Sequence, residues 1–438
     1  MKRLGLGIGL LGSSLVLAGC GGASVASHPK NEPYYGQTIT VDFIYPSPPK
    51  NLLKQFTKKT GITVKWVDTG FGPLQTKIAS SMEANTYFSD VTDVDWSKVG
   101  EYNRLHWFVP LNKYFNVHSL SKDVPQLTSF IVHGTLVGMP ADSSFFVTTI
   151  NARDFHKAGI NKIPTTISQY TADLKLLQKK KISNHPLDIP FAAAEGLTGN
   201  WFQATAAFGG SVLGNHGQPL FTSSNSPGYK ALQWMVSAYR SGLVPSANVS
   251  MLPLQAMSQE MAQNSVASVF ADFSGNVGGI YNVSSSSSVV NDVKYIPVPG
   301  VKGPGKSLGN PDGLGIPVTA KHKGAAAVFI KWFTSSKNQA IWSGLKGTSE
   351  AIPTFPTPMR ISSFKTLVDA HKLPGGNQLL YLLHNKVSPM FPYGAPPWYA
   401  QFSATVSSNI HAVVSGSETT HQAIQAMAAK ARQLNSGS

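Results

Sequence analysis

The stretch Thr38-Ile39-Thr40-Val41-Asp42-Phe43 alternates polar and apolar residues, a pattern typical of a β-strand. Leu52 and Phe56 then share one face of a predicted helix, and Gly61 stands where a helix C-cap belongs. Ile62-Thr63-Val64-Lys65-Trp66 alternates again. A strand, a helix and a strand in such close succession predict a βαβ unit, and therefore a parallel sheet within an α/β fold.

The same succession of strand and helix signals continues along the chain. Strands are predicted at 91–96, 145–150 and 266–270, with a hairpin-like pair of short apolar pieces at 134–140. Apolar residues spaced three and four apart predict helices at about 73–84, 166–181, 228–241, 323–345 and 420–434. No repeat of fixed period is visible.

The N-terminus has the features of a secretion signal. Lys2 and Arg3 precede an apolar run over 4–16, which is too short to span a membrane comfortably. Leu17-Ala18-Gly19-Cys20 resembles a bacterial lipobox, which implies cleavage before Cys20 and lipidation of its thiol. The alternative is an ordinary signal peptide with a stray cysteine. We favour the lipobox because Cys20 is the only cysteine among 438 residues.

The charge balance is strongly basic, at +15, because the chain has only 21 Asp and Glu. The basic residues are scattered, with Lys179-Lys180-Lys181 as the longest run, and the chain is exported, so nucleic acid is a poor candidate for a partner. Scarce carboxylates suit an acidic medium, where carboxylates would protonate and lose their ionic contacts. Residues 20–36 are polar and rich in turn formers, and predict a flexible stalk before the body.

Motifs for catalysis are missing from the sequence. Gly300-Val301-Lys302-Gly303-Pro304-Gly305-Lys306-Ser307 matches the P-loop pattern letter for letter, but such a loop must lead into a helix. Leu308-Gly309-Asn310-Pro311 follows and cannot begin one, so we predict a turn between two strands. No nucleophile elbow, H-E-x-x-H or other tight metal spacing is present, and we expect neither cofactor nor metal.

Several short segments match, in order and spacing, those of the extracellular solute-binding proteins of ABC importers, in the family that carries sugars such as maltose. They are the opening strand and the segments 56–64, 109–112, 134–140 and 325–339. The resemblance covers nearly all of residues 37–434. It implies a type II periplasmic-binding-protein fold, with two α/β lobes and a ligand cleft between them.

The resemblance also implies that each lobe is discontinuous in sequence. The first would comprise 37–146 and 309–356, and the second 147–308 and 357–434. Crossings between the lobes would fall near 146, 309 and 356. The segment Pro353-Thr354-Phe355-Pro356-Thr357-Pro358 has the stiffness that such a crossing requires.

Aromatic residues are the strongest candidates for ligand binding, because the apolar faces of sugar rings stack on flat aromatic rings. Trp398 and Tyr399 follow Pro396-Pro397 and resemble the family's C-terminal stacking pair. The alternative for Trp398 is a place in the core. The resemblance implies further ligand contacts. In the first lobe these would be the carboxylate of Asp95 and the ring of Trp96, with Asp142 as an acid that binds a sugar hydroxyl. Phe273 would be another stacking aromatic, and Trp201 would line the second lobe. Pro46-Ser47-Pro48 departs from the charged pair of some maltose binders.

The predicted protein is therefore a monomeric, lipid-anchored substrate-binding subunit of an ABC importer, on the outer face of the cell membrane or in the periplasm. It would close on a mono- or oligosaccharide and deliver it to the permease subunits, without being an enzyme. Other small solutes, such as ferric ion, thiamine or a polyamine, are the runner-up ligands. An exported glycan-active enzyme is the alternative from a different class.

Overall fold

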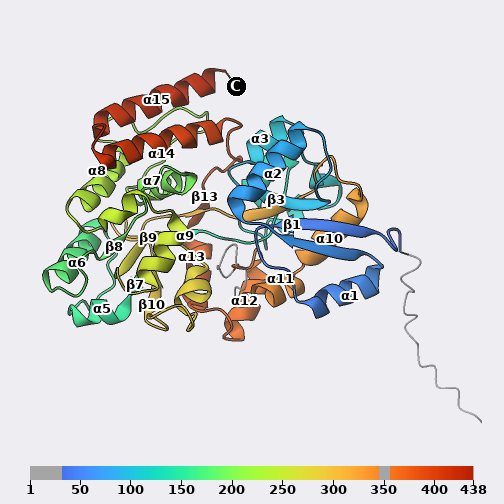
Figure 1. Ribbon diagram of the computed structural model, residues 1–438, viewed down its shortest axis with the longest axis horizontal. Helices are drawn as coiled ribbons and strands as arrows, with labels where there is room; N and C mark the ends of the chain where they lie inside the picture. The colour runs from blue at the N-terminus through green and yellow to red at the C-terminus, as the bar shows by residue number, and fades with distance from the viewer. Residues whose placement is uncertain (1–31, 345–355, 438) are drawn as a thin grey trace, which may run out of the picture.

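The computed structural model describes residues 32–344 and 356–437 (Figure 1). The signal peptide, Cys20, most of the stalk and the segment just before the predicted crossing at 356 lie outside this part of the chain. The described residues form two α/β lobes side by side, each built on its own sheet. No helix within them is long and apolar enough to cross a membrane.

The sheet of the first lobe has five strands, in the order β2-β1-β3-β12-β6. Their bounds are β1 (Thr38–Phe43), β2 (Thr63–Asp68), β3 (Val91–Asp95), β6 (Met139–Pro140) and β12 (Asp312–Gly315). The predicted parallel pairing is confirmed for β1 with β2 and β3. It is wrong for β12, which runs antiparallel to β3 and β6 because the chain re-enters this sheet from the second lobe.

The helices of the first lobe bury apolar faces against this sheet. Leu52 and Phe56 of the first helix are buried, and the helix ends at Gly61, whose φ of 71° allows its N–H to reach Thr57 O at 2.7 Å. The helix predicted over 323–345 is two helices, because the chain turns at Thr334 and Ser335. This lobe contains α1 (Lys50–Thr60), α2 (Phe71–Glu83), α3 (Val99–Arg104), η2 (Leu111–Lys113), α4 (Val117–Leu120), η3 (Leu127–Phe130), α10 (Lys323–Phe333) and α11 (Ser336–Ser343).

The predicted hairpin is shifted along the chain. The short strands β4 (Ile131–Val132) and β5 (Thr135–Leu136) pair through a turn at His133 and Gly134, both with positive φ. The piece at 139–140 joins the main sheet instead, as β6. Glycine at 134 suits this turn, since the left-handed conformation costs a residue without Cβ little.

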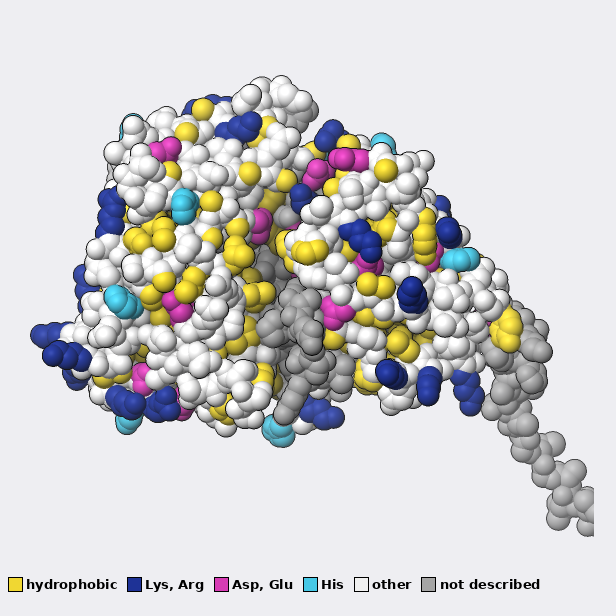
Figure 2. Space-filling view, in the orientation of Figure 1, with side chains coloured by type: hydrophobic (Ala, Val, Ile, Leu, Met, Phe, Trp, Pro, Cys, Tyr) yellow, Lys and Arg dark blue, Asp and Glu magenta, His cyan; other side chains and the backbone are white. Residues whose placement is uncertain are grey.

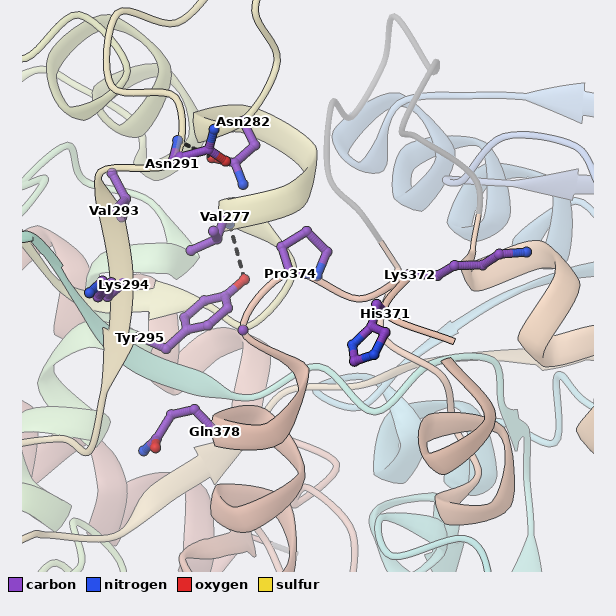
Figure 3. Close-up of a pocket in the computed structure, with 11 residues that line it drawn as sticks. Val277, Asn282, Asn291, Val293, Lys294, Tyr295, His371, Lys372, Pro374 and Gln378 are labelled. Carbon is purple, nitrogen blue, oxygen red and sulfur yellow. Dashed lines mark hydrogen bonds between the residues drawn. The ribbon is translucent and has the colours of Figure 1, made fainter. Parts of the chain in front are cut away.

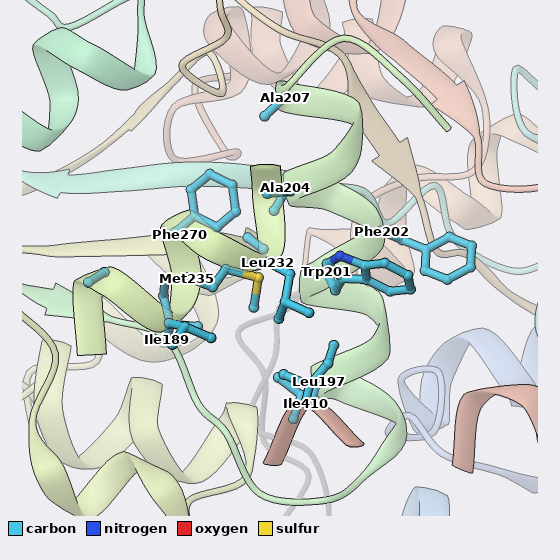
Figure 4. Close-up of a cluster of buried hydrophobic side chains, with 14 of the residues drawn as sticks. Ile189, Leu197, Trp201, Phe202, Ala204, Ala207, Leu232, Met235, Phe270 and Ile410 are labelled. Atoms are coloured by element: carbon cyan, nitrogen blue, oxygen red, sulfur yellow. The ribbon is translucent and has the colours of Figure 1, made fainter. Parts of the chain in front are cut away.

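The sheet of the second lobe has four strands, in the order β10-β7-β9-β8. β7 runs antiparallel to both neighbours, and β8 is parallel to β9. The bounds are β7 (Phe146–Asn151), β8 (Leu187–Asp188), β9 (Ser268–Phe273) and β10 (Val293–Ile296). Two separate apolar cores pack against this sheet, and Figure 4 shows part of the larger one, between α7, α8 and α14.

Three helices of the second lobe and its flanks were predicted, and all three begin and end within two residues of the predicted bounds: α6 (Ile167–Lys179), α8 (Pro227–Arg240) and α15 (Thr420–Ser436). No helix range was predicted from the sequence for the others, which are α5 (Ala152–Lys157), α7 (Glu195–Ala207), η4 (Ser246–Val249), α9 (Pro253–Ala256), η5 (Met257–Met261), η6 (Val277–Tyr281), α12 (Ile361–Asp369), α13 (Gly376–Asn385) and α14 (Tyr399–Ser415).

The chain passes between the sheets over 141–145 and 310–311, next to the predicted crossings near 146 and 309. Both passages are held together by backbone bonds, since Phe145 bridges to Gly309 and Asp142 bridges to Pro358. A small sheet of β11 (Ser307–Gly309) and β13 (Val387–Pro389) lies beside them. The exact residues at which one lobe ends and the other begins stay a prediction.

Candidate functional site

The two lobes touch through aromatic rings. Trp96 directly follows β3 of the first lobe, and its ring stacks on Phe391 with 6.1 Å between centroids and 23° between planes. It also meets Tyr399 at 5.3 Å, and only 6% of Trp96 is exposed. We call Trp96, Phe391 and Tyr399 the interlobe aromatic cluster. Figure 2 shows the surface furrowed where the lobes meet, with hydrophobic and acidic side chains along it.

Tyr399 is held in place from two elements. It is the first residue of α14 and is fully buried, and its hydroxyl donates a 2.9 Å hydrogen bond to Glu195 at the start of α7. Burial raises the pKa of the Glu195 carboxyl, and the charge of Asp95 in the first lobe adds to the effect. Glu195 keeps an exposed edge, so solvent screens part of this shift.

A group of four acids lies beside Trp96 in the first lobe, and we call Asp93, Asp95, Asp142 and Asp312 the carboxyl cluster. The Tyr45 hydroxyl lies 2.7 Å from Asp142 and 3.2 Å from Asp312, so it can donate to either. Burial raises the pKa of all four carboxyls, that of Asp142 to about 6, and the charges of neighbouring acids add to the shift for Asp93, Asp142 and Asp312. This arrangement offers hydroxyl and carboxyl groups that can hydrogen-bond a polar ligand.

Individual bonds orient these acids. Asp142 accepts from the backbone N–H groups of Ser144 and Asp312, each at 3.1 Å. Asp95 accepts from the N–H of Ser97 at 2.8 Å and from its hydroxyl. One buried oxygen of Asp93, Oδ1, has no hydrogen-bond partner within residues 32–344 and 356–437. Backbone N–H groups therefore fix Asp95 and Asp142, while the side chains of Gln75 and Tyr45 bond Asp93 and Asp312.

The structure brings together four of the seven residues expected to bind ligand. Asp95, Trp96 and Tyr399 lie at the contact between the lobes, and Asp142 lies in the carboxyl cluster beside it. Phe273, at the end of β9, is half-buried and stacks on Phe146 with 5.7 Å between centroids. It therefore packs within the second lobe.

Trp398 lies apart from the interlobe aromatic cluster. It is 7% exposed and packs edge-on against Phe402, 6.0 Å between centroids. Its ring also covers Gly217, where an added Cβ would come within 2.8 Å of it. Trp398 thus packs against the second lobe, while its neighbour Tyr399 reaches the first.

Trp201 lies in the core of the second lobe rather than at its surface (Figure 4). It is fully buried, its indole N–H donates to Gly228 O at 2.9 Å, and it packs edge-on against Phe221 at 5.0 Å. Its polar atom is satisfied and its ring is covered, so we leave Trp201 out of the proposed site.

Sequence reasoning missed Tyr45, Glu195, Asp312 and Phe391. One signal was available for Tyr45, which comes just after β1 at the edge of the sheet where β3 ends in Asp95, and ligands gather at the carboxyl ends of such strands. Asp312 enters that edge from a distant segment, and no local pattern marks Glu195 or Phe391.

The P-loop match forms a turn, as predicted. Gly305 N–H bonds back to Val298 O at 2.8 Å, and Pro299 bridges to Pro304. Ser307 begins a strand, β11, so no helix follows the loop as a P-loop requires. The N-terminus of α6 packs against the loop instead, and Ile167 N–H donates to Gly300 O at 2.8 Å. In the part of the chain that the structure describes, no group of three or more His, Cys, Asp or Glu is arranged to hold a metal ion.

A separate cavity of about 560 Å³ lies within the second lobe (Figure 3). Its wall includes Tyr295, whose hydroxyl accepts from Val277 N–H at 3.0 Å, together with Lys294, His371 and Lys372. It shares no residue with the interlobe aromatic cluster or the carboxyl cluster, so it is not part of the candidate site.

Two sheet-based lobes, joined by paired crossing segments and meeting through aromatic and carboxyl side chains, define a two-lobed solute-binding protein. The family model described as "Bacterial extracellular solute-binding protein" matches residues 45–340. The chain belongs to this family. The family match confirms the predicted class, a binding protein rather than an enzyme, and an exported one.

Solved structures share the fold at low sequence identity. Maltose-bound MalE3 of T. maritima matches with a TM-score of 0.76 and 20% identity, over 91% of this chain and 99% of its own. The sugar-binding protein MalE from Xanthomonas citri gives 0.71 and 17%, over 92% and 98%. An Agrobacterium vitis ABC-transporter solute-binding protein with bound D-mannitol gives 0.73 and 19%, over 92% and 99%. None of the curated proteins compared with the chain matches it.

Proposed function

We propose that this protein is the carbohydrate-capturing subunit of an ABC importer, and that the sugar binds between Trp96 of the first lobe and Tyr399 and Phe391 of the second. The stacking of Trp96 on Phe391 carries the proposal. Two flat rings from opposite lobes lie face to face where the ring of a sugar would insert. The fold's neighbours with bound maltose and D-mannitol support a polyhydroxylated ligand.

Polar groups beside these rings would fix the orientation of the sugar. Asp95 and Asp142 can accept hydrogen bonds from sugar hydroxyls, and the Tyr45 hydroxyl can donate or accept. In the ligand-free protein these groups bond to one another and to backbone N–H groups. Binding would exchange those bonds for bonds to the ligand while the rings part to admit it.

Delivery of the sugar would need no chemistry from this chain. The closed lobes would dock on permease subunits, and ATP hydrolysis would take place in other subunits of the importer. Lipidation of Cys20 would hold the protein at the outer face of the membrane, with the residues after it as a tether.

A thermal-shift screen of the purified protein tests the ligand class. The panel contains maltose, longer oligosaccharides, monosaccharides and D-mannitol, with ferric ion, thiamine and spermidine as the alternative solutes. A ligand that binds only the native state raises the melting temperature by mass action, by about 2.7 kcal/mol of stability at a hundred times its Kd. We expect a shift with at least one sugar and none with the alternative solutes.

Matched variants tie the shift to the proposed site. Trp96→Ala should abolish it, while Tyr393→Ala, on the same segment as Phe391 but 71% exposed, should leave it unchanged. A shift with spermidine or ferric ion alone would contradict the proposal, and turnover of a glycoside would contradict the class.

A further inference from the structure

We propose that closure of the two lobes takes up protons, so that the closed form is favoured in an acidic medium and weakened toward neutral pH. The inference rests on the two-lobed binding function proposed above and concerns the regulation of that same site. It stands on the placement of carboxyl groups at the contact between the lobes and at the crossing segments.

Carboxyls from opposite lobes lie on the two sides of this contact. Asp95 precedes Trp96 in the first lobe, and Glu195 of the second lobe holds Tyr399, whose ring touches Trp96. The charges of Asp95 and Glu195 repel in the closed form. Separation of the lobes would expose the buried Asp95 to water and move it away from Glu195, so that this repulsion is screened.

The neighbouring groups increase the negative charge. Asp93, Asp142 and Asp312 lie close to Asp95, and the last two lie where the two crossings meet the first lobe. The other charged or titratable groups that face these acids are Lys98, Glu101 and the buried phenols of Tyr45, Tyr102 and Tyr399. Lys98 bonds Glu101 at 3.3 Å. Lys98 lowers the pKa of both Asp95 and Glu195, but it faces several acids at once.

The composition makes this concentration of acids unusual. The whole chain has 36 Lys and Arg and only 21 Asp and Glu. Six of those acids nevertheless meet around the contact between the lobes, namely Asp93, Asp95, Glu101, Asp142, Glu195 and Asp312. Because these acids lie where the lobes meet, the free energy of closure depends on whether they are protonated, and therefore on pH.

The direction follows from proton linkage. Exposed carboxyls have pKa values of about 4. In the closed form burial raises the pKa of Asp95, and burial together with the charge of Asp95 raises the pKa of Glu195 to about 7. The closed form therefore binds protons more tightly than the open form. Closure takes up protons between about pH 4 and pH 7, and the ratio of closed to open protein falls by up to tenfold per pH unit for each proton taken up.

Small-angle X-ray scattering of the ligand-free full-length protein tests this at pH 4, 5, 6, 7 and 8. We expect the radius of gyration to rise with pH in the wild-type protein. The double variant Asp95→Asn, Glu195→Gln carries neutral groups of the same shape and should have a markedly weaker pH dependence. Glu260→Gln is the matched control, because Glu260 is a buried acid of the second lobe with a raised pKa that bonds to Asn248, away from the contact. It should behave as the wild type does.

Two outcomes would overturn the inference: a radius of gyration independent of pH in the wild type, or the same pH dependence in the double variant. If the double variant fails to fold, as judged by circular dichroism, Glu195→Gln alone replaces it, since Glu195 keeps an exposed edge. The measurement uses no sugar. If the lobes open with pH but no sugar binds, the proposed ligand is rejected and this inference stands. If a sugar binds but the lobes do not open with pH, this inference is rejected and the proposed ligand stands.

Discussion

Trp96 and Phe391 lie stacked with 6.1 Å between their ring centroids, although one belongs to the first lobe and the other to the second. In the ligand-free protein the two rings cover each other's faces, which would otherwise be exposed to water. A bound sugar ring would cover the same two faces. The side chains of this contact should therefore affect binding, while aromatic residues packed within one lobe should affect stability.

Trp96→Ala and Trp398→Ala should separate these two effects. Loss of Trp96 should weaken sugar binding by roughly thirty-fold, or about 2 kcal/mol, with a smaller change in the melting temperature than loss of Trp398 causes. Loss of Trp398, which packs on Phe402 and Gly217, should lower stability by about 3–5 kcal/mol and leave the affinity of the folded fraction nearly unchanged. Calorimetric titration and a ligand-free melt of each variant measure both. Weakened binding with intact stability in Trp398→Ala would reverse our assignment.

Glu260 should make the protein less stable as pH rises. Asn248 donates to Glu260 at 3.2 Å and to Asp188 at 3.0 Å, and burial raises the pKa of Glu260 to about 7. The folded state thus binds this proton more tightly than the unfolded state, so the stabilisation is full below about pH 4 and is lost toward pH 7. Denaturant unfolding at pH 5 and pH 8 should show the decrease, and Glu260→Gln should reduce the slope by up to about 1.4 kcal/mol per pH unit. An unchanged slope would place the titrating group elsewhere.

Asp90→Ala should destabilise the first lobe. The buried Asp90 carboxylate accepts from the backbone N–H groups of Thr40, Lys321 and His322 at 2.9–3.0 Å, and so joins β1 to the segment before α10. Removing it leaves these donors unpaired, at a cost of about 3 kcal/mol or more. Glu83→Ala, at an exposed site nearby in sequence, is the control and should change little. Equal unfolding midpoints for the two variants in urea would refute the role of Asp90.

Lys306→Ala should leave ligand affinity, melting temperature and nucleotide binding as they are. Lys306 is exposed in the turn before β11, and no helix follows to bind phosphate. Titration with fluorescent ATP, before and after the change, checks this. ATP binding by the wild type that disappears in the variant would show that the P-loop match is functional.

Cys20→Ser should release the protein from the membrane fraction, because a serine cannot carry the thioether-linked lipid. Membrane and soluble fractions of cells producing each form would be compared by immunoblot, with wild-type protein as the control. A variant that stays membrane-bound with wild-type mobility would rule out a lipid anchor at this residue.

The sequence was sufficient for the class of fold, because strand and helix periodicities are local properties of the chain. The strand at 38–43, the helix ending at Gly61 and the strand that follows are found as predicted. The turn at 300–307 could also be read locally, since proline and glycine exclude the helix that a P-loop needs. Local patterns could not show that β12 runs antiparallel, because its direction depends on a return from the other lobe.

The site was decided by the tertiary structure. Trp398 and Tyr399 are neighbours, but successive side chains on a helix point about 100° apart, so one packs on its own lobe and the other reaches Trp96. Tyr45 meets Asp312 across 267 positions, a contact that no local pattern encodes. The sequence by itself determined which elements form and that the protein is a two-lobed binder. Only the packing of those elements decided which aromatic rings and carboxyls share the contact between the lobes, because that depends on which face of each element is buried.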